Sequence, residues 1–483
     1  MLTDLFLQAI MKFVKARIET ASDDLAATLD FATFEAEMNE LMNQIGTLMV
    51  AIKLADLLTS AAFLVKLKQL GAHKGMHFKE YRMVTVYFAT GQKVLVPTPY
   101  FVKAKPKRGR KKRGPNGRGS HLGLEMLGLI GRGSPNLVSE VVKMAVLCPS
   151  LEVANAMLAG RGVVIDVSTM RRFCRQLAEK GMRFRGPVSL SGQEDLTGNT
   201  LVIGVDGGRL RERRPKRGRK KQGQKRQGYY SEWREPKLFT IYLLDEQGQV
   251  VKSFSPLHDA TMGKHEATFA LLQRYLSALP LDDVARIVFC GDGAPWLWSD
   301  VERLCQQMGL LEKCPVYQVL DYIHAQQNLQ EIIDLVSMCV KKKEKIEEKW
   351  RQLLWHGDIQ GLYQEINRLL SGAKQRWAIK KWQNYFQANE KRMQYQMFKA
   401  VHIPCGSGCV ESAIRRIINL RLKSTGTFWK EDMAECFLFL RSQLLSGRWF
   451  IFWRNAIRQS ARAWLNLHDC LDIELFQPAL VKA

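Results

Sequence analysis

Apolar residues recur at helical spacing through the first seventy residues. This spacing gathers apolar side chains on one face and predicts two or three amphipathic helices in residues 1–70. Their apolar faces either join the subunits of an oligomer or pack onto the body of the same chain. Residues 82–103 instead alternate between apolar and polar on both sides of Thr-Gly-Gln, which predicts a β-hairpin.

Residues 137–181 contain three short segments of helical periodicity separated by turn residues. Helices are expected to begin near Ser139, near Ser150 and after Asp166. Helices of this length and spacing are typical of a DNA-binding helix-turn-helix, although an ordinary three-helix packing unit has the same pattern. The third helix is basic and could face a DNA groove through Arg171, Arg172 and Arg175.

From residue 198 onward the pattern alternates between strands and helices. Three strands are followed by alternating helices and strands, which is the RNase H-like order in a mixed α/β fold. The connection between the first two strands, residues 207–237, is long and is predicted to be a loop. The predicted strands are 201–206, 238–245, 249–255, 286–291 and 315–320, and the predicted helices are 264–278 and 298–309.

Three acids of this region lie at the ends of predicted strands or at the start of a predicted helix. Asp206 and Asp292 each end an apolar run beside glycines, and Glu411 falls in the first turns of a helix that begins near Ser407. Hard carboxylate oxygens are the ligands that Mg²⁺ prefers, and three carboxylates on rigid elements could hold two ions. We therefore expect a site for two Mg²⁺ ions, with Mn²⁺ as a possible substitute. Taken singly, each aspartate could equally be an ordinary loop acid beside a glycine turn.

The net charge changes the picture of what the chain binds. The 483 residues, 46% of them hydrophobic, can form about three domains. A formal net charge of +25 indicates a polyanionic partner such as double-stranded DNA. The most apolar window, residues 47–65, contains Lys53 and Asp56, so we expect no membrane segment and a cytoplasmic, nucleoid-associated protein.

Two basic runs share one sequence. Residues 103–118 read KAKPKRGRKKRGPNGR, and the core PKRGRKK recurs at residues 215–221. Such segments cannot form a packed core, so both are expected to be loops that become ordered on a phosphate backbone. The Arg-Gly-Arg core also resembles an AT-hook, and a merely solvated charge run is the simplest alternative. The DNA-contacting residues predicted in the second copy are Arg217, Arg219 and Lys220.

The ten cysteines form no Cys-x-x-Cys pair, and most of them lie within apolar patterns. We interpret residues such as Cys148, Cys290 and Cys436 as reduced thiols of the core. Cys405 and Cys409 form a lone Cys-x-x-x-Cys, which is weak evidence for zinc.

Several motifs occur in order between residues 201 and 445 and together resemble the DDE transposases of bacterial insertion sequences of the ISKra type. They are IGVDGGR, WREPK, GDGAPW, DYIH, GCVESAIRR, NLRLK and TGTFW. The resemblance implies an RNase H-like catalytic domain in which Asp206, Asp292 and Glu411 hold the metal ions. Asp321 and His324 resemble the Asp-x-x-His motif of the wider group, in which the acid could orient the histidine toward a phosphate or a base of the DNA. His324 could equally be a satisfied polar residue at a helix start. Arg415 and Arg416 would contact phosphates.

The resemblance also implies a helical insertion that helps to hold transposon ends. Its tryptophans either contact DNA or build the core of the insertion; they are Trp350, Trp355, Trp377 and Trp382. The predicted domains are a helical region (1–80), a β element with a basic linker (81–120), a helix-turn-helix domain (121–190), a catalytic domain (198–324 and 406–446), the insertion (325–405) and a helical tail (447–483).

The predicted function is transposition, in which a homodimer or higher oligomer cleaves DNA at transposon ends and joins it to a target. An RNase H-like nuclease or resolvase would use the same acids. A domesticated DNA-binding protein that no longer cuts DNA is the third alternative. Terminal inverted repeats beside the gene would separate the first two.

Overall fold

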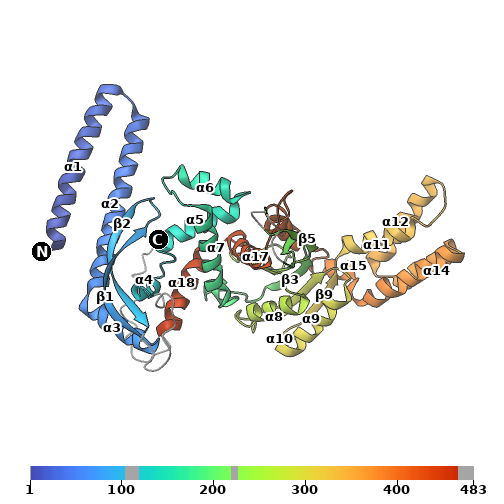
Figure 1. Cartoon of the computed structure of the whole chain (residues 1–483). Coiled ribbons are helices and arrows are strands. Elements are labelled where there is room, and N and C mark those ends of the chain that lie inside the picture. Colours follow the sequence, from blue (N-terminus) through green and yellow to red (C-terminus); the bar gives the residue numbers. More distant parts are fainter. Residues whose placement is uncertain (1, 104–118, 219–222, 224–226, 466–483) are drawn as a thin grey trace. The chain divides into compact units, whose positions relative to one another are not determined.

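The computed structural model describes residues 2–103, 119–218, 223 and 227–465. The chain divides into two compact units (Figure 1). The second unit is Gly181–Asn455, and the first contains the residues on either side of it. This division is coarser than the six predicted domains, which therefore stay a prediction.

Three helices open the first unit, as the apolar spacing predicts. They are α1 (Leu2–Thr28), α2 (Phe31–Thr59) and α3 (Ala61–His73), and α1 runs alongside α2 (Figure 1). Asp30 caps α2 by accepting a hydrogen bond from the Thr33 amide at 3.1 Å. Large apolar side chains remain exposed on both helices, among them Met11, Met42 and Val50.

Helix α2 is long and apolar enough to cross a membrane, judged by length and composition alone. Only 22% of its most apolar window is buried in the structure. A core helix of a soluble protein passes the same test, so the expectation of no membrane segment stays a prediction.

The predicted hairpin is present. It consists of β1 (Met76–Tyr87) and β2 (Lys93–Lys103), which pair antiparallel. Helix α3 packs on it closely, because a Cβ at Gly71 would lie 2.9 Å from a ring carbon of Phe101. Phe101 and Leu67 are fully buried there, in a core shared by the helices and the hairpin.

Further helices follow the hairpin in the chain. They are α4 (Leu122–Met126), α5 (Pro135–Leu147), α6 (Leu151–Ala159) and α7 (Val167–Met182). Ser134 and Ser150 cap α5 and α6, and Asp166 accepts a hydrogen bond from the Thr169 amide at 2.8 Å. The three segments predicted for a helix-turn-helix are thus helical, although α5 begins four residues earlier than expected.

A mixed five-stranded sheet forms the centre of the second unit. Its strands lie in the order β7-β6-β3-β8-β9. The β3–β6 and β6–β7 pairs are antiparallel, whereas the β3–β8 and β8–β9 pairs are parallel. The bounds are β3 (Thr200–Gly207), β6 (Lys237–Leu244), β7 (Leu257–Thr261), β8 (Arg286–Gly291) and β9 (Val316–Leu320).

The prediction of a third strand at residues 249–255 is wrong. The third strand of the sheet in chain order is β7, which lies further along the chain. Its sequence LHDAT carries polar residues but is buried throughout. Arg185 makes this possible, because its guanidinium donates to both carboxylate oxygens of Asp259 at 2.7 and 2.8 Å. A buried carboxylate needs such a partner, and this one comes from 74 residues away.

The long connection predicted as a loop is also different. It contains a two-stranded antiparallel hairpin formed by β4 (Leu210–Pro215) and β5 (Tyr229–Arg234). The turn between the two strands contains the second basic run, part of which lies outside the described residues.

Helices cover the sheet and follow it. The 3₁₀ helix η1 (Pro187–Ser189) precedes β3, and between the later strands lie α8 (His265–Leu276), α9 (Pro295–Met308) and α10 (Leu310–Lys313). After β9 come α11 (Tyr322–Ile333), α12 (Val340–His356), α13 (Ile359–Leu369), α14 (Gly372–Lys381), the π turn η2 (Trp382–Phe386), the 3₁₀ turn η3 (Gln387–Arg392) and α15 (Tyr395–Ala400). The chain then forms α16 (Gly408–Ile414), the π turn η4 (Arg415–Asn419), α17 (Glu431–Leu445) and α18 (Trp449–Leu465).

The segment after β9 is helical, as predicted, and two of its tryptophans are core residues. Trp350 and Trp382 are buried, and the Trp382 indole N–H donates to the Ile359 carbonyl at 2.9 Å. Trp355 packs against Tyr322 and Tyr395. Of the four, only Trp377 is largely exposed.

Candidate active site

Asp206 and Asp292 stand at the ends of neighbouring strands. The last residue pair of the parallel β3–β8 ladder is Val205 with Gly291, and each aspartate follows its member of that pair. Neighbouring strands lie about 4.8 Å apart. The register therefore brings the two carboxylates together at one edge of the sheet, as the sequence predicts.

The electrostatics of Asp206 reflect this placement. Burial raises the pKa of the Asp206 carboxyl, and the charge of Asp292 raises it further. The Gly207 amide donates to Asp206 Oδ1 at 2.6 Å and opposes this rise, as do the nearby His324 and Lys237. The site thus holds two acids that repel each other, with two basic groups close by.

Helix α16 covers the same part of β3. A Cβ at Gly204 would lie 3.1 Å from Val410 Cβ, and one at Gly208 would meet the side chain of Ile418. Side chains alternate along a strand, so positions 204, 206 and 208 face the same side of the sheet. Asp206 therefore faces the side on which α16 packs.

Glu411 follows Val410 on this helix. It is exposed, and its Oε1 accepts a hydrogen bond from Ser407 Oγ at 3.3 Å. Within the described ranges, no three His, Cys, Asp or Glu side chains form a group that could hold a metal ion. Glu411 therefore lies on the helix that packs on the Asp206 side of the sheet, but its part in a catalytic triad stays a prediction.

Asp321 joins three segments. Its backbone N–H donates to the Gly291 carbonyl at 2.8 Å, its Oδ1 accepts from the His324 amide at 2.9 Å, and its Oδ2 accepts from the Ser407 amide. Only 1% of the residue is exposed. Asp321 thus positions His324 and the start of α16, and its predicted part in DNA binding stays a prediction.

His324 lies beside the two acids. It is half-buried at the start of α11, and its charge lowers the pKa of Asp206. The Asp-x-x-His motif therefore places its histidine near the ends of β3 and β8. The strand that precedes the motif in the chain is β9.

Sequence reasoning missed Lys237 and Trp296. Lys237 pairs with Gly207 across the β3–β6 ladder, and its Nζ lies 2.7 Å from Glu235 Oε1 and 4.6 Å from the centre of the Trp296 ring. Lys237 belongs to the motif WREPK and Trp296 to the motif GDGAPW. Their positions in the sequence, beside the predicted strand ends, could have indicated that they belong to the site.

Tyr385 was missed for a different reason. It belongs to η2 and its ring packs so closely on Gly293 that a Cβ there would overlap it. Burial raises the pKa of the Tyr385 hydroxyl, and Asp292 and Asp321 raise it further. The helical segment thus contributes a residue next to Asp292, and no local pattern could reveal this contact across 92 positions of sequence.

The predicted DNA-contacting arginines are on the surface wherever the structure describes them. Arg171, Arg172 and Arg175 are exposed on one side of α7, opposite the buried Phe173 and Leu177. The exposed set also includes Arg217, Arg415 and Arg416. Arg219 and Lys220 lie outside the described residues, as does the first basic run from residue 104.

None of the nine cysteines in the described part of the chain forms a disulfide. Cys290 and Cys436 are buried as predicted, whereas Cys148 is only half-buried. Burial raises the pKa of the Cys290 thiol well above its usual range, so this thiol stays protonated near neutral pH.

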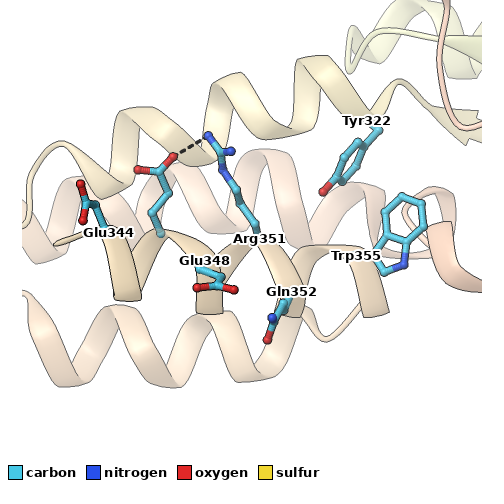
Figure 2. Close-up of a pocket in the computed structure, with 7 residues that line it drawn as sticks. Tyr322, Glu344, Glu348, Arg351, Gln352 and Trp355 are labelled. Atoms are coloured by element: carbon cyan, nitrogen blue, oxygen red, sulfur yellow. Dashed lines mark ion pairs between the residues drawn. The ribbon is translucent and has the colours of Figure 1, made fainter. Parts of the chain in front are cut away.

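An open hollow of about 470 Å³ lies on the helical segment after β9 (Figure 2). Tyr322 and Trp355 line one end, and Glu344 lies toward the other. Glu347 forms an ion pair with Arg351 at 2.5 Å, which Figure 2 marks with a dashed line. Its acidic lining does not suit a phosphate, so we do not place the reaction there.

No protein-family model matches the sequence, and no curated protein matches it. A solved structure of a Drosophila P element transposase strand transfer complex is distantly similar to this chain. Its sequence is 10% identical, the match covers 67% of this chain and 92% of that chain, and the TM-score is 0.29. A likeness this distant assigns neither the fold nor the function, so the resemblance to the ISKra type rests on the motifs alone.

Proposed function

We propose that this protein is a transposase of an insertion sequence, which cleaves DNA strands in a metal-dependent reaction and joins them to a target. One observation carries the proposal: Asp206 and Asp292 follow the last residue pair of two adjacent parallel strands. The sheet order supports an RNase H-like catalytic domain, since three antiparallel strands are followed by two parallel ones.

The carboxylate pair fits a divalent cation. Mg²⁺ is commonly held by one or two carboxylates together with water and substrate phosphates, so two acids suffice for a first ion. Burial raises the pKa of Asp206 most and repulsion from Asp292 adds to the rise, and a bound cation would relieve that repulsion. Glu411 would complete a second site if α16 shifted or if its side chain turned toward Asp206. When bound, Mg²⁺ would activate a water or a 3′-hydroxyl and stabilise charge on the phosphate.

The chain's own residues supply the rest of the site. Asp206 and Asp292 would hold the ions in place, while Lys237 brings positive charge to the same edge of the sheet and the His324 side chain lies nearby. A scissile phosphate is an anion, so the Lys237 charge would favour its approach. Asp321 holds His324 in position through the hydrogen bond to its amide.

Exposed arginines provide the surface for double-stranded DNA. Those on α7 project from a single helix face whose opposite side is buried, as in a recognition helix. Arg415 and Arg416 follow α16 and are exposed beyond the helix that covers Asp206. The exposed apolar residues of α1 and α2 suit a homodimer or higher oligomer, in which two such units would hold two transposon ends.

The test is a joining assay with a donor plasmid that carries the DNA flanking this gene on both sides. Wild-type protein with Mg²⁺ should cut at the ends of the element and join them to a target plasmid. Asp206→Ala, Asp292→Ala and Glu411→Ala should each abolish both steps while DNA binding persists. Asp282→Ala is the matched control, because Asp282 is an acid whose side chain is 82% exposed.

Two results would overturn the proposal. Cleavage at near wild-type rate in Asp206→Ala or Asp292→Ala would remove the acids from the reaction. Cleavage without joining, on any donor, would favour an RNase H-like nuclease or resolvase.

A further inference from the structure

The hairpin formed by β4 and β5 has two unlike faces. Side chains alternate along paired strands, so Leu210, Glu212 and Arg214 share one face, and Arg211 and Arg213 share the other. Leu210 and Glu212 are buried, so the first face packs inward at these two positions, whereas nearer the turn Arg214 and Tyr230 on that face are exposed. On the second face, which we call the outward face, Arg213, Tyr229 and Trp233 are exposed and Arg211 is half-buried.

The outward face combines arginines with aromatic rings. The register pairs Arg211 with Trp233 and Pro215 with Tyr229, which places both rings beside the arginines. Trp233 is 56% exposed and Tyr229 45% exposed. Phe428 joins them from another part of the chain, with its ring 5.6 Å from that of Tyr229. We call these residues the aromatic–arginine face: Arg211, Arg213, Tyr229, Trp233 and Phe428.

The position of Phe428 is fixed by the backbone. The Trp429 N–H donates to the Arg211 carbonyl at 2.9 Å, and the Arg213 N–H donates to the Trp429 carbonyl at 2.8 Å. The neighbouring segment therefore lies along β4 like a third strand. The rings are held on a small sheet and not on a loose loop, so a ligand would meet a preformed surface.

Acids and arginines are sorted between the two faces. Glu212 and Glu232 lie on the inward face, where Arg214 and Arg234 pair with them at 2.9 to 3.8 Å. On the outward face, the described residues offer Arg211 and Arg213 no carboxylate partner within ion-pair distance. Arg211 instead lies over two rings, 5.5 Å from Trp233 and 4.7 Å from Phe428. The guanidinium also donates to the Ser424 carbonyl at 3.5 Å, so among the described residues its charge has no anionic partner.

We propose that the aromatic–arginine face binds unpaired nucleotides of DNA, with bases stacked on its rings and phosphates contacted by Arg211 and Arg213. Exposed rings interleaved with cations are the surface that single strands prefer, because every base has a flat face to stack and every nucleotide carries a phosphate. A duplex hides its base faces within the helix and cannot use the rings in this way. A protein partner would gain little from two unneutralised arginines unless it were acidic.

The place of the face in the chain suggests which nucleotides these are. Strand β4 begins four residues after Asp206, so Arg211 lies within about 18 Å of that acid even if the chain is fully extended. In the proposed function, on which this inference rests, cleavage leaves a free strand end at Asp206. The face would hold the unpaired nucleotides next to that end.

The test measures binding without metal, so that no cleavage occurs. Fluorescence anisotropy would compare wild-type protein on a labelled single-stranded thymidine oligonucleotide and on a duplex of the same length. Trp233→Leu should weaken binding of the single strand by about 5- to 100-fold and leave duplex binding within about 2-fold. Arg211→Gln should weaken single-strand binding and lower its salt dependence by about one unit of slope.

Trp377→Leu is the matched comparison. Trp377 is 46% exposed and lies under a lysine, Lys381 Nζ being 5.4 Å from its ring centre, but it belongs to the helical segment. It should bind the single strand as wild type does. Oligonucleotides carrying 5-bromodeoxyuridine should form photo-crosslinks to Trp233 or Tyr229. Circular dichroism melting of each variant would show that the fold is intact.

The outcomes separate this inference from the proposed function. Equal loss on single and double strands in Trp233→Leu would show a plain electrostatic surface and overturn the inference, as would a loss confined to Trp377→Leu. Neither result touches the requirement for Asp206 and Asp292 in cleavage. Conversely, cleavage that survives without those acids would overturn the proposed function even if the face binds single strands.

Discussion

The two sheets of the second unit are built on opposite principles. In the five-stranded sheet, β3 is buried from Thr200 to Val205, and its acid emerges only at the strand end. In the two-stranded hairpin, β5 is exposed from Tyr229 to Trp233 and carries polar and aromatic residues. Rigid packing suits groups that must be placed accurately for chemistry, whereas exposure suits groups that must meet a long, flexible polymer. We therefore expect substitutions in the first sheet to change the reaction or the fold, and those in the hairpin to change binding.

The largest effect should come from Asp206→Asn. Loss of a carboxylate that holds the reacting centre should lower the cleavage rate by about 1,000-fold or more. Binding of the single-stranded oligonucleotide should stay at the wild-type level, because the hairpin is unchanged. Trp233→Leu should show the reverse, with weakened binding of that oligonucleotide and cleavage that recovers at saturating protein. Cleavage rates at saturating protein, measured for both variants, would test this difference between the two sheets. If both variants had the same defects in cleavage and in single-strand binding, the proposed division of roles would be wrong.

The next effect concerns stability. Arg185→Met should destabilise the second unit by about 3–5 kcal/mol, because it leaves Asp259 as a buried charge without its partner. In the hairpin, Arg214→Met should cost about 1 kcal/mol or less, because the Arg214 side chain is 48% exposed and Arg234 still pairs with Glu212. Urea unfolding followed by tryptophan fluorescence gives both values. Similar losses for the two would mean that the hairpin is as tightly built as the central sheet.

A third prediction separates two kinds of basic residue. Arg171→Ala or Arg172→Ala on α7 should cost about 1–3 kcal/mol of discrimination between transposon ends and random duplex. Lys216→Gln or Arg217→Gln near the hairpin turn should weaken binding to all duplexes alike and lower the salt slope by about one unit each. Titrations at several salt concentrations would distinguish them. If both pairs behaved alike, α7 would not be a recognition helix.

The smallest effect is that of pH. Burial and then Asp292 raise the pKa of Asp206, so the folded protein binds this proton more tightly than the unfolded chain does. The resulting stabilisation is fully present below the ordinary value of 3.8 and is lost as pH rises through the folded pKa. Above that pH, Asp206→Asn should therefore be more stable than wild type, by an amount that shrinks as pH falls. A constant difference across this range, in unfolding experiments at each pH, would show that Asp206 titrates normally.

The contrast between the buried central sheet and the exposed hairpin also explains which strands could be predicted from the sequence. Strands β3, β6, β8 and β9 are apolar runs in the sequence and could be predicted from it. The acids that follow β3 and β8, Asp206 and Asp292, could therefore be predicted too. Strand β7 could not, because its buried Asp259 depends on Arg185. The hairpin could not be predicted either, since the basic residues of β4 give no strand pattern, and the backbone contact of β4 with Trp429 joins segments some 200 positions apart.

The site was predictable to the same degree. Asp206 and Asp292 follow from local patterns and from the parallel register that those patterns imply. The closeness of His324 was suggested only by the resemblance to a family, and the contact of Tyr385 with Gly293 by nothing in the local sequence. Glu411 was placed on the correct helix, but the orientation of its side chain depends on how α16 packs across β3.

Binding of Mn²⁺, followed by electron paramagnetic resonance with a non-cleavable duplex present, tests the central claim most directly. The claim is that Asp206 and Asp292 form one divalent-cation site at the ends of β3 and β8. Wild-type protein and the control Asp282→Asn should bind Mn²⁺ with equal affinity, and Asp206→Asn and Asp292→Asn should each bind it at least about 10-fold more weakly. Wild-type affinity in either strand-end variant would contradict the claim.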